Sequence, residues 1–123
     1  MKALLLVAHG SRRPEANEEV RRLAAAVRRR ATGFGAVKVA FLEFTEPTVA
    51  EGLEACIAMG ATQVTVFPYL LSMGSHVAAD IPRAVAARQK AHPEALIRVA
   101  PHLGLAEGLA ELIVSHLEPR PDR

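Results

Sequence analysis

Cysteines and long apolar runs are both scarce in this chain. Cys56 is the single cysteine among 123 residues, which excludes an internal disulfide framework and fits a reducing compartment. The opening apolar segment, residues 3–8, is too short for the apolar region of a signal peptide or for a membrane span, and no long apolar run appears later. We therefore expect a cytoplasmic protein with no membrane partner.

The chain also lacks a strong excess of either charge. Fifteen basic and 13 acidic side chains leave a formal net charge of +2. The basic residues are scattered and become dense only at Arg28–Arg30, a run that is most simply the solvated end of a helix. Half of the residues are apolar, which is enough for one core but not for two domains. We expect one globular domain and no nucleic-acid partner.

Short motifs typical of metal and phosphate sites are absent as well. The sequence contains no HxxxH, HExxH or CxxC pattern, and no glycine-rich phosphate loop follows the first apolar run. A generic nucleotide-binding function is therefore disfavoured, and a metal site has no local motif to support it.

The apolar pattern predicts the fold class. Short β-rich runs alternate with longer segments of helical period, which is typical of βαβ units and a parallel sheet. We predict an α/β fold, a single-domain three-layer sandwich with a four-stranded parallel sheet. The domain is expected to span residues 1–118, followed by a short disordered tail at 119–123. The predicted strands are Ala3–Val7, Val37–Leu42, Gln63–Phe67 and Leu96–Val99.

Four helices are expected between and after these strands. The first opens at Pro14 and is stopped by Gly33 and Gly35, and the second opens at residues 45–47. The third is expected to start near Asp80 or Pro82, because proline is costly inside a helix. The last is expected to direct its apolar side chains toward the core: Leu105, Leu109, Leu112, Ile113 and Leu117.

Two histidines, His9 and His76, each follow an apolar strand. In a parallel sheet the carboxyl ends of the strands share one edge, so both imidazoles could face one cleft. Glu43, on a third loop at that edge, would complete a plausible site for a divalent transition metal. The alternative for His9 is a loop histidine that is satisfied by a neighbouring carbonyl group.

Other residues near this edge allow two interpretations each. Asp80 either faces His76 one helical turn away and holds its tautomer, or caps the following helix. Leu71 and Met73 either cover the face of a flat ligand or seal the edge of the core. His102 lies on the last loop and could neighbour the site, whereas Cys56 is expected in the core rather than among the ligands.

Four phrases give the chain a specific resemblance. Together they cover nearly its whole length, and it resembles the short CbiX-type sirohydrochlorin chelatases in their order and spacing. The phrases are LLVAHGSRRPEAN, AFLEFTEPTV, VTVFPYLLSMGSHVAADIP and VAPHLGLAEGLAEL. The resemblance implies a chelatase-like fold and the insertion, without ATP, of Co²⁺ or Fe²⁺, and in some relatives Ni²⁺, into sirohydrochlorin. The routes served would be cobalamin, sirohaem or a nickel tetrapyrrole. The metal ion would be a substrate, and no organic cofactor is expected.

The resemblance also assigns roles to particular residues. His9 and His76 correspond to the two family histidines, and the segment Leu71 to Ser75 to the part that lies against the macrocycle. We expect His9 to be the principal base and ligand, His76 the second ligand, and Glu43 a proton acceptor or orienting group. Because only neutral imidazole binds metal ions, activity should fall below about pH 6. The expected substrate-binding residues are Ser11, Arg12, Thr45, Leu71, Ser72, Met73, Gly74, Ser75 and His76.

Sirohydrochlorin is a polycarboxylate, so cationic and N–H groups at this edge are candidates for binding its rim. We expect Arg12, Arg13 and free N–H groups at the helix starts after Ser11 and Thr45 to do so. The larger chelatases of the superfamily place two such lobes around one cleft, and this chain has one. A homodimer is therefore expected, because one small sheet edge covers one side of a macrocycle.

Two alternatives belong to other functional classes. A carrier of metal or tetrapyrrole would keep the same ligands without turnover. A histidine phosphatase would also place a histidine and a glycine after the first strand, but Ala8 stands where that family needs an arginine for phosphate.

Overall fold

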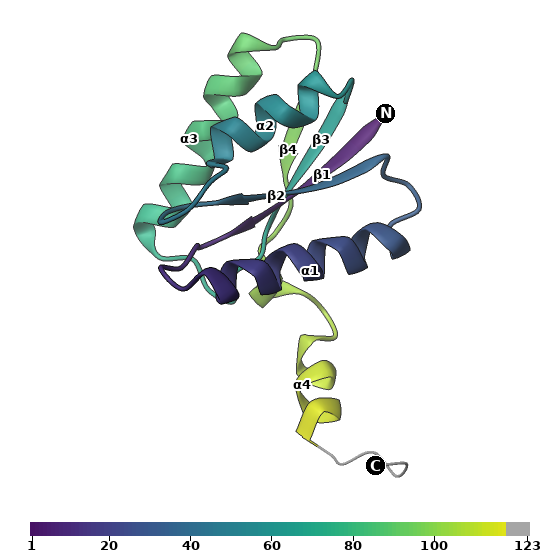
Figure 1. Ribbon diagram of the computed structural model, residues 1–123, viewed down its shortest axis with the longest axis vertical. Helices are drawn as coiled ribbons and strands as arrows, with labels where there is room; N and C mark the ends of the chain where they lie inside the picture. Colours follow the sequence, from purple (N-terminus) through teal and green to yellow (C-terminus); the bar gives the residue numbers. More distant parts are fainter. Residues whose placement is uncertain (118–123) are drawn as a thin grey trace.

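The computed structural model describes residues 1–117, and the predicted tail at 119–123 lies outside them. Strands and helices alternate along the described chain, as Figure 1 shows. The elements are β1 (Lys2–Ala8), α1 (Pro14–Arg30), β2 (Ala36–Phe41), α2 (Val49–Ala58), β3 (Gln63–Pro68), α3 (Ser75–Ala91), β4 (Leu96–Val99), the short 3₁₀ helix η1 (Leu103–Leu105) and α4 (Leu109–Leu117).

The strands form one parallel sheet in the order β2-β1-β3-β4. All four predicted strands are confirmed, with ends within one residue of the expected ones. In this order, the chain moves outward in one direction after β1 and in the other after β3. The loops after β1 and β3 therefore diverge and leave a crevice at the carboxyl edge, which is where open α/β sheets bind ligands.

Helices cover both faces of the sheet, which confirms the three-layer sandwich. Gly52 of α2 lies against Leu5 and Ala40, whereas the Arg21 side chain of α1 lies over the Phe41 ring, 5.2 Å from its centroid. Ala40 and Phe41 are neighbours in β2, so they point to opposite faces. The main core lies on the face covered by α2 and α3, and its fully buried side chains include Leu5, Leu53, Cys56, Val64, Val66 and Ile81.

Helix α3 starts earlier than the sequence predicts, and Pro82 lies inside it. The predicted start near Asp80 or Pro82 is wrong, because packing outweighs the cost of the proline. Ile81 is fully buried in the core, and Val77 packs against it from the first turns. Pro82 and Ala78 are exposed, so water can reach the carbonyl group that the proline leaves without an N–H partner. The early start places His76 in the first turn of α3.

Helix α2 starts later than predicted. Its N-cap is Thr48, not Thr45, and the helix opens with a reciprocal capping box. The Thr48 hydroxyl accepts from the Glu51 N–H at 3.2 Å, and the Glu51 carboxylate accepts from the Thr48 N–H at 2.8 Å. Residues 42–48 are therefore a loop, which gives the carboxyl edge of β2 a longer irregular segment than expected.

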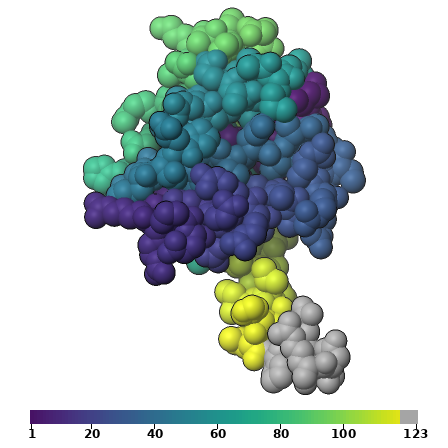
Figure 2. Space-filling model, in the orientation of Figure 1, coloured from purple at the N-terminus to yellow at the C-terminus, as the bar shows by residue number. Residues whose placement is uncertain are grey.

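Helix α4 projects away from the sandwich, as Figures 1 and 2 show. The expectation that the last apolar side chains pack into the core is wrong within residues 1–117, and Leu109 alone of that set is half-buried. The large apolar side chains at the surface of this region are Leu105, Leu112, Ile113, Val114 and Leu117, each more than half exposed. A helical period indicates that a face is to be covered, but not by which partner.

No helix within residues 1–117 is long and apolar enough to cross a membrane.

Candidate functional site

One cavity at the carboxyl edge of the sheet brings the main candidate residues together. It has a volume of about 670 Å³, and His9, Glu43 and His76 all contribute to its wall. These residues come from three connections, after β1, after β2 and at the start of α3. The predicted convergence of the three side chains is therefore a feature of the structure. The full lining is His9, Leu42, Glu43, Leu70, Ser72, Gly74, Ser75, His76, Val77 and Asp80.

His9 and Glu43 contact each other across two loops. The His9 Nε2 atom lies 3.3 Å from the Glu43 Oε1 atom, and both side chains are about half exposed. The backbone brings them together, because the Glu43 N–H donates to the His9 carbonyl at 3.0 Å. Gly10 allows this approach, since it has φ +93° and lies directly against the Glu43 backbone. The imidazole and the carboxylate can therefore share a proton between Nε2 and Oε1, which an isolated loop histidine cannot do.

The loop after His9 is fixed by a buried amide, which the sequence did not indicate. The Asn17 side chain, 5% exposed, accepts from the Ser11 N–H at 2.9 Å and donates to the Ser11 carbonyl at 2.8 Å. The Ser11 hydroxyl accepts from the Arg13 N–H at 3.0 Å. Of the N–H groups that follow Ser11 and were expected to be free, that of Arg13 is thus occupied. Ser11 shapes the loop and does not line the cavity.

The N–H groups that were expected to bind the rim after Thr45 depend on where α2 starts. Helix α2 begins three residues later, and the capping box uses the N–H groups of Thr48 and Glu51. Thr45 lies in the loop between Glu43 and the helix, where it does not line the cavity. An Arg21 Nη2 atom of α1 donates to the Glu46 carbonyl at 3.4 Å and so braces this loop.

Some residues of the segment 70–76, which leads into α3, line the cavity and others do not. Ser72, Gly74, Ser75 and His76 line it, but Leu71 and Met73 do not. Met73 is half-buried and packs against the core, which matches the interpretation of a side chain that seals the core edge. Leu71 is 70% exposed. Its backbone lies against Gly104, and the Gly104 N–H donates to the Leu70 carbonyl at 3.1 Å, so the last loop supports this segment from behind.

Asp80 lines the cavity but does not cap a helix, because α3 already begins at Ser75. The helical spacing from His76 is as predicted. The contact partner of the Asp80 carboxylate within residues 1–117 is Arg83, whose Nη1 atom lies 3.3 Å from Oδ1. Both side chains are more than half exposed. Asp80 thus adds negative charge to the wall of the site, and its proposed contact with the His76 ring is not formed.

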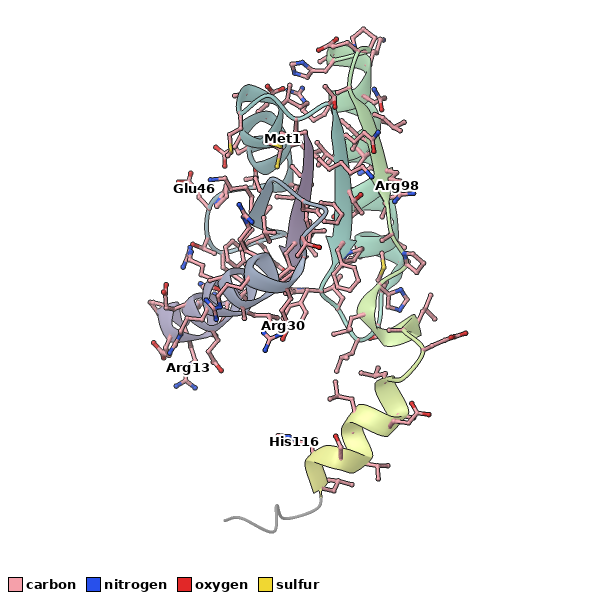
Figure 3. The ribbon with its side chains drawn as sticks, turned by 90° about the vertical axis from the view of Figure 1, so that its right-hand side faces the viewer. Met1, Arg13, Arg30, Glu46, Arg98 and His116 are labelled. Carbon is pink, nitrogen blue, oxygen red and sulfur yellow. The ribbon has the colours of Figure 1, made fainter. Side chains whose placement is uncertain are left out.

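The two arginines after Ser11 have different surroundings. The Arg13 Nε atom lies 3.0 Å from the Glu15 carboxylate, and Figure 3 shows Arg13 at the outer end of α1, pointing away from the domain. The Arg12 guanidinium instead lies over the ring of Phe44, 4.9 Å from its centroid. Phe44 was not predicted, and it has no motif that would reveal it. Its position beside Glu43 is the one available signal.

The remaining histidines and the cysteine lie elsewhere. His102 does not line the cavity, and it precedes η1 as its N-cap residue. His92 closes the far end of α3, where its Nε2 atom is 2.8 Å from Glu54. Cys56 is fully buried, and burial raises the pKa of its thiol. Within residues 1–117, no group of three or more His, Cys, Asp or Glu side chains is arranged to hold a metal ion.

The fold and the site together define a class: a parallel α/β domain with two imidazoles and a carboxylate facing one cavity at its topological switch point. The CbiX family model matches residues 3–119. The chain belongs to the CbiX family.

Relatives with assigned names support this membership. A sirohydrochlorin cobaltochelatase of Saccharolobus islandicus is 34% identical, over 95% of this chain and 94% of its own length. One of Priestia megaterium is 31% identical, over 96% of this chain but 38% of its own length. The sirohydrochlorin chelatase SirB of Bacillus subtilis subspecies spizizenii, solved in complex with cobalt, superimposes with a TM-score of 0.84 at 30% identity, over 94% of this chain and 49% of SirB. The chain thus spans half or less of these two longer proteins.

Proposed function

We propose that this protein is a sirohydrochlorin chelatase that inserts a divalent metal ion into the macrocycle without ATP. The observation that carries the proposal is the convergence of His9 and His76, with Glu43, on one cavity of about 670 Å³. The named relatives support it, above all the cobaltochelatase of Saccharolobus islandicus, which this chain matches over nearly its full length. The metal is a substrate, so the ligands need to hold it only until it is transferred.

The chemistry follows from what metal insertion requires. The incoming ion has to lose water, and two pyrrole N–H protons have to leave. In our proposal His9 and His76 replace part of the hydration shell, because neutral imidazole is a good ligand for Co²⁺, Fe²⁺ and Ni²⁺. The His9 Nε2 atom faces Glu43, so in our proposal the neutral ring keeps its proton on Nε2 and would bind the ion through Nδ1. As the ion passes to the macrocycle, the ring nitrogens that it leaves on His9 and His76 would each take up one of the two pyrrole protons, and the Glu43 carboxylate would stabilise the protonated His9 ring.

The proposal includes the metal ions that the protein would insert and the pathways that the product would serve. Co²⁺ and Fe²⁺ are both expected substrates, since relatives are named for either metal. Ni²⁺ is a third, because imidazole binds it between Co²⁺ and Cu²⁺ in strength. The product would serve the synthesis of cobalamin, sirohaem or a nickel tetrapyrrole in the cytoplasm.

We further propose that the working form is a homodimer. SirB is about twice as long as this chain, and a second copy would supply the length that one copy lacks. The exposed apolar side chains of α4 support this, because a helix face that leaves several large apolar side chains exposed is typically covered by a partner.

An anaerobic absorbance assay with catalytic amounts of protein tests the enzymatic proposal. Sirohydrochlorin is mixed with Co²⁺, Fe²⁺ or Ni²⁺, and the wild type is compared with His9→Ala and His76→Ala. His102→Ala is the matched control, since His102 lies on a loop of the same edge but outside the cavity. Multiple turnovers that are lost in the first two variants and kept in the control would support a chelatase.

The same assay separates the enzyme from a carrier. A carrier would yield at most one equivalent of metallated product per site and would still bind the macrocycle. Metallation no faster than the protein-free rate with every ion would contradict the enzymatic proposal. The histidine-phosphatase interpretation is replaced by the membership of the CbiX family.

A further inference from the structure

Arg12 and Phe44 form a stacked pair beside the site. They come from different loops, one after β1 and one after β2, and the Arg12 Cζ atom lies 4.9 Å from the centroid of the Phe44 ring. Each residue is close in sequence to a residue of the His9–Glu43 contact. The pair is therefore carried by the same two loops as the His9–Glu43 contact, and neither of its side chains lines the cavity.

Phe44 has an unusual backbone and an unusual exposure. Its φ is +71°, a left-handed conformation that bulky side chains rarely adopt. Its side chain is 52% exposed, so core packing does not explain why the conformation is kept. Strained residues of this kind concentrate at functional sites. In this conformation the ring lies below the Arg12 guanidinium.

The Arg12 guanidinium is available for a ligand. Its sequence neighbour Arg13 is paired with Glu15 at 3.0 Å, but no carboxylate within residues 1–117 lies within 4 Å of Arg12. A guanidinium that rests with its face on an aromatic ring keeps its N–H groups free at the edge. Such an edge binds a carboxylate through two parallel hydrogen bonds.

We propose that Phe44 is a positioning residue that presents Arg12 to a carboxylate of the tetrapyrrole rim. The inference rests on the proposed function, in which the substrate is a polycarboxylate. Phe44 acts through Arg12: it restricts the guanidinium to one orientation, so less conformational entropy is lost when the carboxylate binds. The pair would fix one edge of the macrocycle while the metal enters near His9 and His76.

A double-mutant cycle tests this inference by substrate binding alone. The dissociation constant of metal-free sirohydrochlorin is measured by fluorescence quenching for the wild type, Phe44→Leu, Arg12→Ala and the double variant. Phe44→Tyr tests rescue, since it keeps the aromatic face, and Arg29→Ala, which removes an exposed arginine from the last turn of α1, is the matched control. We expect Phe44→Leu to weaken binding about two- to fivefold and Arg12→Ala about tenfold. Phe44→Tyr and Arg29→Ala should match the wild type.

The cycle identifies the route by which Phe44 acts. If Phe44→Leu has no further effect once Arg12 is alanine, the positioning role is supported. Equal weakening in both backgrounds would overturn it, because Phe44 would then contact the macrocycle independently of Arg12. Unchanged binding in Phe44→Leu, or a wild type that does not bind sirohydrochlorin, would also overturn it. A wild type that binds but does not insert metal would contradict the chelatase and leave the binding cycle fully interpretable.

Turnover gives a second readout. In a chelatase, Phe44→Leu should raise KM and leave kcat unchanged, because the reacting groups are untouched. A fall in kcat at constant KM would contradict a positioning role. Thermal unfolding of each variant, followed by circular dichroism, shows whether the fold is kept.

Discussion

The α-carbon of Gly10 lies so close to Glu43 that a Cβ atom there would overlap the Glu43 carbonyl oxygen. The φ of Gly10, +93°, is unfavourable for other residues as well. Two loops that carry the base candidate and its carboxylate partner are thus in backbone contact at a glycine.

Gly10→Ala should therefore damage both stability and activity. We expect a loss of more than about 1 kcal/mol in the free energy of unfolding, measured with urea, and slower metal insertion because His9 and Glu43 are pushed apart. Gly33→Ala is the matched control, since Gly33 has no neighbour within 4 Å of an added Cβ. An unchanged Gly10→Ala variant would show that the two loops are not held together at this point.

The contacts of Glu54 on α2 with Arg88 and His92 at the end of α3 should make the free energy of unfolding depend on pH. The neighbouring His92 and Arg88 side chains lower the pKa of Glu54 below its usual value. The unfolded chain then takes up the Glu54 proton at higher pH than the folded chain does. The stability that Glu54 contributes is present above the usual glutamate pKa, about 4.3, and is lost as the pH falls through the lower folded value.

The measurement is a set of urea unfolding curves between pH 7 and pH 3. The wild type should lose stability below about pH 4.5 more steeply than Glu54→Gln, which has no proton to take up. Glu19→Gln, an exposed change on α1, is the control and should follow the wild type. Parallel curves for all three proteins would contradict the contribution of Glu54.

The core position Ile81 should be among the costliest to truncate. Its side chain is fully buried, and it directly precedes Pro82 within α3. We expect Ile81→Ala to lower the free energy of unfolding by about 2–5 kcal/mol, and Met59→Ala, which is half exposed, by less than about 0.5 kcal/mol. A small effect at Ile81 would mean that packing does not hold α3 together across Pro82.

The apolar side chains of α4 should decide the oligomeric state. The wild type is expected to sediment as a dimer at micromolar concentration, and a variant with both Leu112→Glu and Ile113→Glu as a monomer with an unchanged unfolding midpoint. Ser115→Glu, on the same helix, is the control for added charge. A monomeric wild type, or a dimer that survives both substitutions, would contradict the role of α4.

The sheet was predictable because its strands are short, β-rich and mostly apolar runs, and the convergence of His9 and His76 followed from strand ends sharing an edge. Helix ends were less predictable. Proline cost suggested a late start for α3, whereas burial of Ile81, which a local rule does not include, determined the real one. The position of α4 could not be predicted, because an amphipathic pattern does not indicate which surface the apolar face packs against. The contacts of Phe44 with Arg12 and of Asn17 with Ser11 leave no periodic signal in the sequence.

Helix α1 holds the loops that follow His9 and Glu43: Asn17 binds the backbone of Ser11, and Arg21 donates to the Glu46 carbonyl group. Opening of the amino-terminal half of α1, which includes both Asn17 and Arg21, would release the two segments at once. Their amide hydrogens should therefore exchange with solvent deuterium at a common rate, set by the opening of that helix rather than by each loop separately. The edge of the sheet that carries His9 and Glu43 would then open in one cooperative step.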